Sequence, residues 1–477
     1  MFSYLRQPVG FYRRLFLLAL PIIVQNLITT SLGFLDTFMV GLLGSEQMSA
    51  VTVANVPIFI IQLIVFGLQS GSSVLISQYW GRGDRESINR VMGIGFMIAG
   101  GVSVLFAAIL CAFPAQVLYL ITDNLTLVTL AEPYLRIVGF SYIFNSLSSI
   151  YIGMQRSIEN PRFGMIVFAT SMLCNTIGNY VLIFGKLGLP PLGILGAGLA
   201  SSIASLCSLC ISASCFLLVN QKEYATRSHK RFHGEYIRKL LCFGTPAGFQ
   251  TFLRNAAFAC VIIMIGRLGN EALAATSIAL SINMIGNMPM IGLMDATSII
   301  TGQYIGKRRL LVADRIAGRS IRMLFLWMLS ISVIYLFCPQ LLIRIFDSQN
   351  QGATNMDNAL VTEYIITILR LAVIFNLLDA TRFITMGSLR GAGDTFVPLL
   401  IGLGTSWLIQ IPGTVYLVYF AHASVGTVWL FITVYIAADA FFMLWRRKSG
   451  AWKHIKVIDL PPSDETCPDP PEPLKQT

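Results

Sequence analysis

The sequence predicts an all-α polytopic membrane protein whose twelve transmembrane helices form two pseudo-symmetric six-helix lobes. Of its 477 residues, 55% are hydrophobic and only 12% are charged, whereas soluble globular chains contain about 25% charged residues. Apolar runs of about 20 residues, long enough to cross a bilayer as a helix, recur along the whole chain. The second half of the sequence also repeats the first half.

The apolar runs follow a short basic segment, residues 1–13, and we expect no cleaved signal peptide because no small-residue cleavage site follows that segment. We interpret residues 14–219 as an N-lobe, 220–236 as a cytoplasmic linker and 237–446 as a C-lobe. Residues 447–477 are predicted to be a disordered cytoplasmic tail, because their proline and acid content is typical of disorder. The predicted spans are 14–40, 50–79, 91–113, 130–155, 163–185, 193–219, 237–266, 272–304, 317–339, 359–388, 395–420 and 424–446.

Lysine and arginine are distributed very unevenly between the two sides of these spans. One side has only Lys186, Arg267 and Arg344, and the other side has all the larger basic clusters and both chain ends. Cytoplasmic loops are enriched in these residues, so we expect both termini in the cytoplasm and a location in the cell inner (plasma) membrane. The net charge of +11 is then explained by topology, and we expect no nucleic-acid partner.

The two halves of the chain align at a nearly constant shift. At 225 residues, Pro21 pairs with Pro246 and "MVGLLGSEQMSAV" pairs with "MIGRLGNEALAAT"; after the third span the shift is 234, and Arg156 pairs with Arg390. Both halves begin on the same side of the membrane, so the repeat is parallel. In transporters built from such repeats, binding sites lie near the midplane of the membrane, at or beside the interface of the repeats.

Asp36 is an acid deep in the first span. The repeat places Val261 at the matching position, so the fold does not require a carboxylate there. Ionisable residues inside membranes usually mark ion or substrate pathways, and we favour that interpretation. The alternative is a hydrogen-bonded structural aspartate near the outer end of the helix.

The fifth span offers polar partners for this acid. Asn175 and Asn179 are one helical turn apart on a single face. They suit a polar pocket for a carboxylate, a hydrated cation or a proton. The alternative is that they only hydrogen-bond neighbouring helices.

The C-lobe has charged residues in its spans as well. Asp379 lies in the tenth span, and its repeat partner is Asn145. Arg382 follows three residues later on the same helical face, and Arg254 lies in the seventh span. An internal ion pair would lower the cost of burying these charges; a role in coupling or substrate binding is equally compatible with the sequence.

Cysteine and histidine give no metal site. There are nine cysteines, and we interpret Cys207 and Cys210, the nearest to a motif, as packing residues. His229 and His233 are four residues apart in the basic linker, where we expect solvated surface residues.

Over residues 10 to 446 the chain resembles the MATE family, the multidrug and toxic compound extrusion transporters, in its bacterial NorM-like branch. The order and spacing of several stretches support this resemblance. They are "LALPIIVQNLITTSLGFLDTFMVGLLG", "ISQYWGRGD", "NTIGNYVLIFGKLGLPPLGILGAGLAS", "GRLGNEALAATSIAL", "GQYIGK" and "LRGAGDT".

The resemblance implies two lobes in a V shape and alternating access, with cation export driven by inward sodium or proton flow. Asp36 matches the acid that the family has in its first helix. Asn179 stands where one branch of the family has an Asp. The positions that match the surroundings of the N-lobe cation or proton site are Pro21, Asn175, Asn179 and Ser201.

In the C-lobe, Asp379 matches the family's acid, but Arg254 replaces the glutamate of the seventh helix. A fixed positive charge repels sodium, so we expect no C-lobe cation site, with Arg254 or Arg382 paired to Asp379. Coupling would then depend on Asp36.

The leading functional prediction is therefore a secondary antiporter that exports organic compounds, cationic or amphipathic, in exchange for H⁺ or Na⁺. Small organic molecules, the coupling cation and the lipid bilayer are its expected partners; we expect a monomer with no cofactor. The alternative is a flippase for a lipid-linked or anionic substrate, because four arginines lie within the spans: Arg136, Arg254, Arg370 and Arg382. We do not expect an enzyme, because no span contains a histidine beside an acid.

Overall fold

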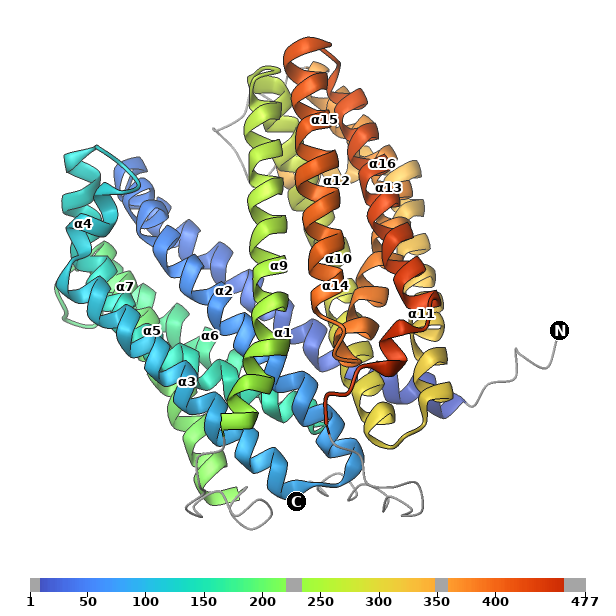
Figure 1. The fold of residues 1–477 in the computed structure, drawn as a ribbon. Coiled ribbons are helices and arrows are strands. Elements are labelled where there is room, and N and C mark those ends of the chain that lie inside the picture. Colours follow the sequence, from blue (N-terminus) through green and yellow to red (C-terminus); the bar gives the residue numbers. More distant parts are fainter. Residues whose placement is uncertain (1–8, 220–233, 348–358, 459–477) are drawn as a thin grey trace. The chain divides into compact units, whose positions relative to one another are not determined.

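The computed structural model describes residues 9–219, 234–347 and 359–458, and most of these are helical (Figure 1). Twelve helices in this part of the chain are long and apolar enough to cross a membrane. The predicted all-α fold and its number of spans are confirmed.

The first half contains six of these spans. Its helices are α1 (Val9–Gly41), α2 (Ser45–Arg82), α3 (Arg85–Ala112), the short α4 (Pro114–Tyr119), α5 (Leu125–Ser157), α6 (Pro161–Phe184) and α7 (Ile194–Ser214), which continues as a π-helical turn, Cys215–Val219.

The second half has the same order of long and short helices. It comprises α9 (Gly234–Gly266), α10 (Asn270–Gly306), α11 (Leu310–Phe337), the short α12 (Pro339–Asp347), α13 (Ala359–Gly391) and α16 (Val425–Lys448). Between α13 and α16 one span, Phe396–Phe420, is divided by π-helical segments into α14 (Phe396–Leu403), Gly404–Gln410, α15 (Ile411–Val415) and Tyr416–Phe420.

The repeat is visible in helix lengths, backbone angles and packing. Helices α1 and α9 each have 33 residues, and α3 and α11 each have 28. Gly44 and its repeat partner Gly269 have φ angles of 131° and 128°, which side chains with a Cβ rarely adopt. Helix α5 packs against α2, α3 and α7, as α13 packs against α10, α11 and α16. These agreements show that the halves are structural repeats.

Two compact units divide the chain inside helices α1 and α9, not at the linker. Unit 1 comprises Met1–Ile23 and Phe249–Val457, and unit 2 comprises Val24–Gly248 and Ile458–Thr477. The lobes expected at 14–219 and 237–446 therefore differ from these units, because the first part of α1 groups with the second repeat and the first part of α9 with the first repeat.

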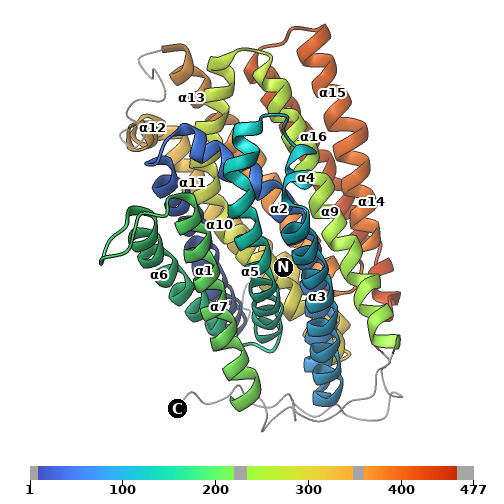
Figure 2. The same ribbon diagram turned by 90° about the vertical axis from the view of Figure 1, so that its left-hand side faces the viewer.

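In unit 1, helices α10, α11, α13 and α16 lie side by side (Figures 1 and 2). The first half of α1 adds Leu15, Leu18 and Ala19 to their buried core. Burying such aliphatic side chains stabilises a fold by roughly 1.5–3 kcal/mol each in water, although in lipid tight packing replaces this driving force. This shared core explains why the start of α1 belongs to unit 1.

In unit 2, the first half of α9 packs closely against α2 through glycines. A Cβ on Gly71 would lie 2.5 Å from the carbonyl oxygen of Leu240 and 2.8 Å from the Cα of Gly244. Small residues allow helix backbones in membranes to approach this closely. The close approach explains why the start of α9 belongs to unit 2.

We therefore expect Gly71→Ala to destabilise the protein, because the backbones of α2 and α9 must separate to accommodate the new methyl group. Overpacking typically costs about 1–3 kcal/mol, which thermal unfolding in detergent would detect as a lower melting temperature. Gly101→Ala on α3 is the control, because its Cβ meets nothing within 4 Å. Equal melting temperatures for the two variants would contradict the glycine contact.

The beginning of the predicted disordered tail is folded, so the predicted boundary at residue 447 is wrong. Helix α16 continues to Lys448, and a 3₁₀ turn follows at Ala451–His454. Trp452 is buried and donates from Nε1 to the carbonyl oxygen of Arg447 at 3.0 Å, and Lys453 Nζ lies 2.9 Å from an oxygen of Asp314. A large apolar side chain and a salt bridge hold this segment on unit 1. The rest of the tail, 459–477, lies outside the described residues, as do linker residues 220–233 with His229 and His233.

Candidate functional site

Each unit contains a polar cluster with a charged residue among its membrane helices. In unit 2 the cluster centres on Asp36, and in unit 1 it centres on Arg382. Both clusters lie at the wall of a cavity within their own unit.

The N-lobe cluster is a chain of hydrogen bonds across three helices of unit 2. Asn179 Nδ2 on α6 donates to Asp36 Oδ1 on α1 at 2.5 Å and to Asn175 Oδ1 at 2.9 Å. Asn175 Nδ2 in turn donates to Ser201 Oγ on α7 at 3.1 Å. The structure thus brings together four of the residues that the sequence singled out.

The one-turn spacing of Asn175 and Asn179 produces this geometry, because residues four apart share a helix face. Asn179 is fully buried, and Asn175 is 2% exposed. Asp36, Asn175 and Ser201 line a cavity of about 500 Å³, and Asn179 does not. Asn179 therefore donates to the carboxylate from outside the cavity wall, whereas Asp36 itself lines the cavity.

The carboxylate has one oxygen to spare. Of the two carboxylate oxygens of Asp36, only Oδ1 accepts a hydrogen bond from a described residue. No lysine or arginine is among the residues that line the cavity. A carboxylate oxygen without a cationic partner can take a proton or coordinate a hard cation, since such cations prefer oxygen ligands. The rest of the cavity wall supplies hydroxyls and amides, including Thr29, Gln62 and Asn145.

Pro21 is not part of this cluster. It lies inside the continuous helix α1 and in unit 1, whereas Asp36 lies in unit 2. The structure therefore does not place Pro21, which the resemblance suggested as a site residue, in the unit that contains the carboxylate.

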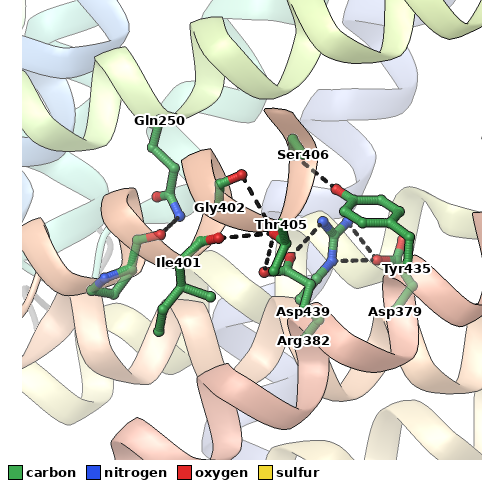
Figure 3. Close-up of polar contacts among 10 residues, drawn as sticks. Gln250, Asp379, Arg382, Ile401, Gly402, Thr405, Ser406, Tyr435 and Asp439 are labelled. Atoms are coloured by element: carbon green, nitrogen blue, oxygen red, sulfur yellow. Dashed lines mark hydrogen bonds and ion pairs between the residues drawn. The ribbon is translucent and has the colours of Figure 1, made fainter. Parts of the chain in front are cut away.

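In unit 1, Arg382 joins two carboxylates (Figure 3). Its Nε lies 2.6 Å and its Nη2 2.5 Å from Asp379 Oδ1, and its Nη1 lies 3.2 Å from Asp439 Oδ2. Arg382, Asp379 and Asp439 are 6%, 8% and 2% exposed. A buried charge is tolerated only when it is paired and hydrogen-bonded, and this triad meets that requirement.

The π-helical segment Gly404–Gln410 supports the triad from one side. Thr405 Oγ1 donates to Asp439 Oδ1 at 3.1 Å, and Ser406 Oγ lies 3.0 Å from the hydroxyl of Tyr435 (Figure 3). Gln250 on α9 donates to the carbonyl oxygen of Pro398 at 2.8 Å, which fastens the same span to α9. Such π segments are frequent at functional sites.

Arg254 does not pair with Asp379. Its guanidinium lies 5.1 Å from the ring centre of Phe383, and the described residues give it neither a hydrogen bond nor an ion pair. Of the two arginines expected as partners of Asp379, Arg382 fills that role.

Sequence reasoning missed Asp439, the second carboxylate on Arg382. The signal was available, because Asp439 is the only acid in the twelfth span, in "YIAADAFFML". The argument that singled out Asp36 applies equally to it.

The eight cysteines that the structure describes do not form a set of metal ligands. Cys207 Sγ lies 3.9 Å from Cys174 Sγ, and Cys210 is exposed. Within the described ranges, no three residues of the types His, Cys, Asp and Glu converge on a possible metal position.

Comparison with known proteins gives consistent matches along the chain. A family model described as MatE matches residues 21–181 and 246–416. A "Probable multidrug resistance protein NorM" of Synechocystis sp. is 25% identical over 435 residues, covering 90% of this chain and 92% of that protein. A protein of the same description from Pseudomonas aeruginosa is 27% identical over 417 residues, covering 86% of this chain and 84% of its own length.

Solved structures share the fold. A multidrug resistance MATE family transporter of the MOP superfamily, described in an outward-facing conformation, matches with a TM-score of 0.82 and 21% identity over 93% of this chain and 96% of its own. A MOP superfamily transporter from Pyrococcus furiosus, described as having a binding pocket of reverse polarity, matches with a TM-score of 0.80 and 21% identity, with the same coverage. At this identity the likeness shows the fold alone.

Proposed function

Because the chain belongs to the MatE family, we propose that it is a secondary active antiporter that exports organic compounds in exchange for H⁺ or Na⁺ by alternating access. The names of its relatives, which describe multidrug resistance proteins, support cationic or amphipathic compounds as the substrates. The predicted number of spans and the chain's family are both established, so the proposal concerns the transported compound and the coupling ion.

The proposal depends on one observation: only one of the two carboxylate oxygens of Asp36 accepts a hydrogen bond from a described residue. Its Oδ1 is held by Asn179 at 2.5 Å, and it lines a cavity of about 500 Å³ with no lysine or arginine among the lining residues. An ionised aspartate is costly inside a membrane helix, roughly 2.5–3.5 kcal/mol at the centre of the helix even on the most lenient scale. A proton or a cation on this carboxylate lowers the cost of burying it.

This chemistry provides a simple exchange mechanism. The coupling ion and an organic cation both require the same carboxylate, so each binds only when the other has left. Asn179 donates to the carboxylate and to Asn175, and Asn175 donates to Ser201, so this chain of hydrogen bonds keeps the carboxylate in place in either state. Substrate could then bind on one side of the membrane only after the coupling ion has been released there, which is what antiport requires.

We further propose that both termini are cytoplasmic and that the protein acts as a monomer in the inner membrane. The basic residues of the loops support this orientation through the positive-inside rule. The family membership supports a multi-pass membrane protein. Which membrane contains it and its oligomeric state are proposals.

A flippase for a lipid-linked or anionic substrate is the second candidate. One observation favours it: Arg254 lines the cavity of unit 1 without an ion pair among the described residues. Against it, Arg382 is neutralised by two carboxylates, Arg136 pairs with Glu132, and Arg370 is exposed. Such a flippase would be expected to have many cationic residues along its cavity, so antiport is the better supported function.

The test of the proposed function is transport in inverted membrane vesicles under an imposed proton or sodium gradient. We expect a panel of fluorescent organic cations to accumulate in the vesicles only when one of these gradients is present, and to leak out when an ionophore collapses it. Vesicles without the protein are the control. Accumulation that depends on neither gradient would contradict antiport.

A further inference from the structure

Unit 1 contains a second cavity, of about 200 Å³, whose wall has a different charge from that of the Asp36 cavity. Arg254 on α9 and the residues Asp379 and Arg382 on α13 all line it. The question is which of these charges is available to a ligand.

The two acids of this region are already engaged. Asp379 accepts from Arg382 at 2.6 Å, and Asp439 accepts from Arg382 at 3.2 Å and from Thr405 at 3.1 Å. Arg254, in contrast, lies over the ring of Phe383, and the described residues give it neither a hydrogen bond nor an ion pair. Its planar guanidinium has five N–H donors and matches a carboxylate in a bidentate geometry. The charge that the wall presents to a ligand is therefore positive.

The fold itself does not require this arginine. The two cavities are equivalent under the repeat: the residues Gly33, Gln62, Asn145 and Ser201 in the first correspond to Phe258, Asn287, Asp379 and Tyr435 in the second. At the position of Arg254 the first cavity has Thr29. One cavity thus presents a carboxylate and the other a guanidinium on the same framework.

The wall around Arg254 also suits an aromatic ring. Phe375 and Trp429 stack with ring centres 5.8 Å apart, and both line the cavity. Asn283 accepts at Oδ1 from Asn376 at 2.8 Å and from Tyr335 at 3.3 Å, so its Nδ2 remains to donate. A cavity of about 150 Å³ is enough to hold benzene, so one ring with its carboxylate fits the available space.

We propose that the cavity of unit 1 binds the carboxylate of a small aromatic acid, with Arg254 as its ion-pair partner and Phe375 and Trp429 against the ring. This inference rests on the proposed function, because it adds a class of substrate to the proposed antiporter. It adds aromatic anions and zwitterions to the organic cations that the Asp36 cavity suits.

The test is ligand-observed ¹⁹F NMR binding to the full chain in detergent, with 4-fluorobenzoate and its uncharged isostere 4-fluorobenzamide. We expect the wild type to bind the benzoate more tightly than the benzamide. In Arg254→Gln, benzoate affinity should fall roughly tenfold to hundredfold, since that is the contribution of a hydrogen bond to a charged group, and benzamide affinity should not change. Arg254→Lys should retain part of the preference.

Two further variants keep this test decisive. Arg254→Thr introduces the residue that the repeat places at this position, so it should fold even if Arg254→Gln does not. Arg136→Gln removes an arginine whose partner is Glu132, outside the cavity, and should bind benzoate as the wild type does. The proposal is overturned if the wild type does not discriminate between the probes, or if both probes lose affinity equally when Arg254 is replaced. Because no ion gradient is involved, such a result would leave the antiport proposal standing.

Discussion

Asp36→Asn is expected to abolish ion-driven efflux while the protein remains folded. The amide oxygen of asparagine can accept the hydrogen bond that Asn179 donates to Asp36 Oδ1, so the local packing is kept. What is lost is the charge that we propose binds a proton or a cation. With one coupled ion per substrate, a tenfold ion gradient drives at most about a tenfold substrate gradient, and the variant should sustain none.

The measurement is the steady-state accumulation of a fluorescent cation in proteoliposomes under an imposed gradient, with protein content and melting temperature determined for each variant. Glu132→Gln is the matched control, because it also neutralises an acid of unit 2 but lies outside the cavity and pairs with Arg136 at the surface. The reverse pattern, in which Asp379→Asn abolishes coupling and Asp36→Asn does not, would refute the assignment.

The sequence predicted part of the polar cluster around Asp36, because local spacing determines which side chains share a helix face. Helical periodicity places Asn175 and Asn179 on one face, and the repeat shows that Val261 replaces the acid in the other half. The contact between Asp36 and Asn179, which are 143 residues apart, and the direction of the hydrogen bonds, with Asn179 as the donor to both Asp36 and Asn175, required the structure.

The sequence could not predict how the chain divides into units. Hydropathy locates a span but does not indicate which neighbours it packs against, because every span is apolar around most of its circumference. The contacts of Leu15 and Leu18 with unit 1, and of Gly244 with Gly71 in unit 2, involve residues far apart in the chain. For the same reason the role of Trp452, which orders the start of the tail, was not predictable from a segment rich in charge.

In unit 1, the pairing of Arg382 with Asp379 follows from their spacing of three residues, but the second carboxylate does not. Asp439 lies 57 residues from Arg382, and only the packing of α16 on α13 brings them together. The resulting cluster has two acids and, with Arg254, two arginines, so its net charge is zero when all four are ionised. This balance determines what the removal of one member should do.

Arg382→Gln is accordingly expected to cause the largest loss of stability of any single substitution considered. It leaves Asp379 and Asp439 buried without their shared cation, and breaking a buried ion pair by removing one partner costs about 3–5 kcal/mol. Thermal unfolding in detergent should show a large decrease in melting temperature. Arg136→Gln, which removes an exposed i,i+4 pair, should cost no more than about 0.5 kcal/mol.

A double variant separates the loss of charge balance from the loss of packing. Arg382→Gln with Asp439→Asn removes one charge of each sign and leaves Asp379 within electrostatic range of Arg254. If charge balance holds this region together, the double variant should be more stable than Arg382→Gln alone, since neighbouring substitutions of this kind are strongly non-additive. The amide oxygen of asparagine can still accept the hydrogen bond that Thr405 donates to Asp439. If the second substitution nevertheless lowers the melting temperature further, the ionic account of the cluster fails.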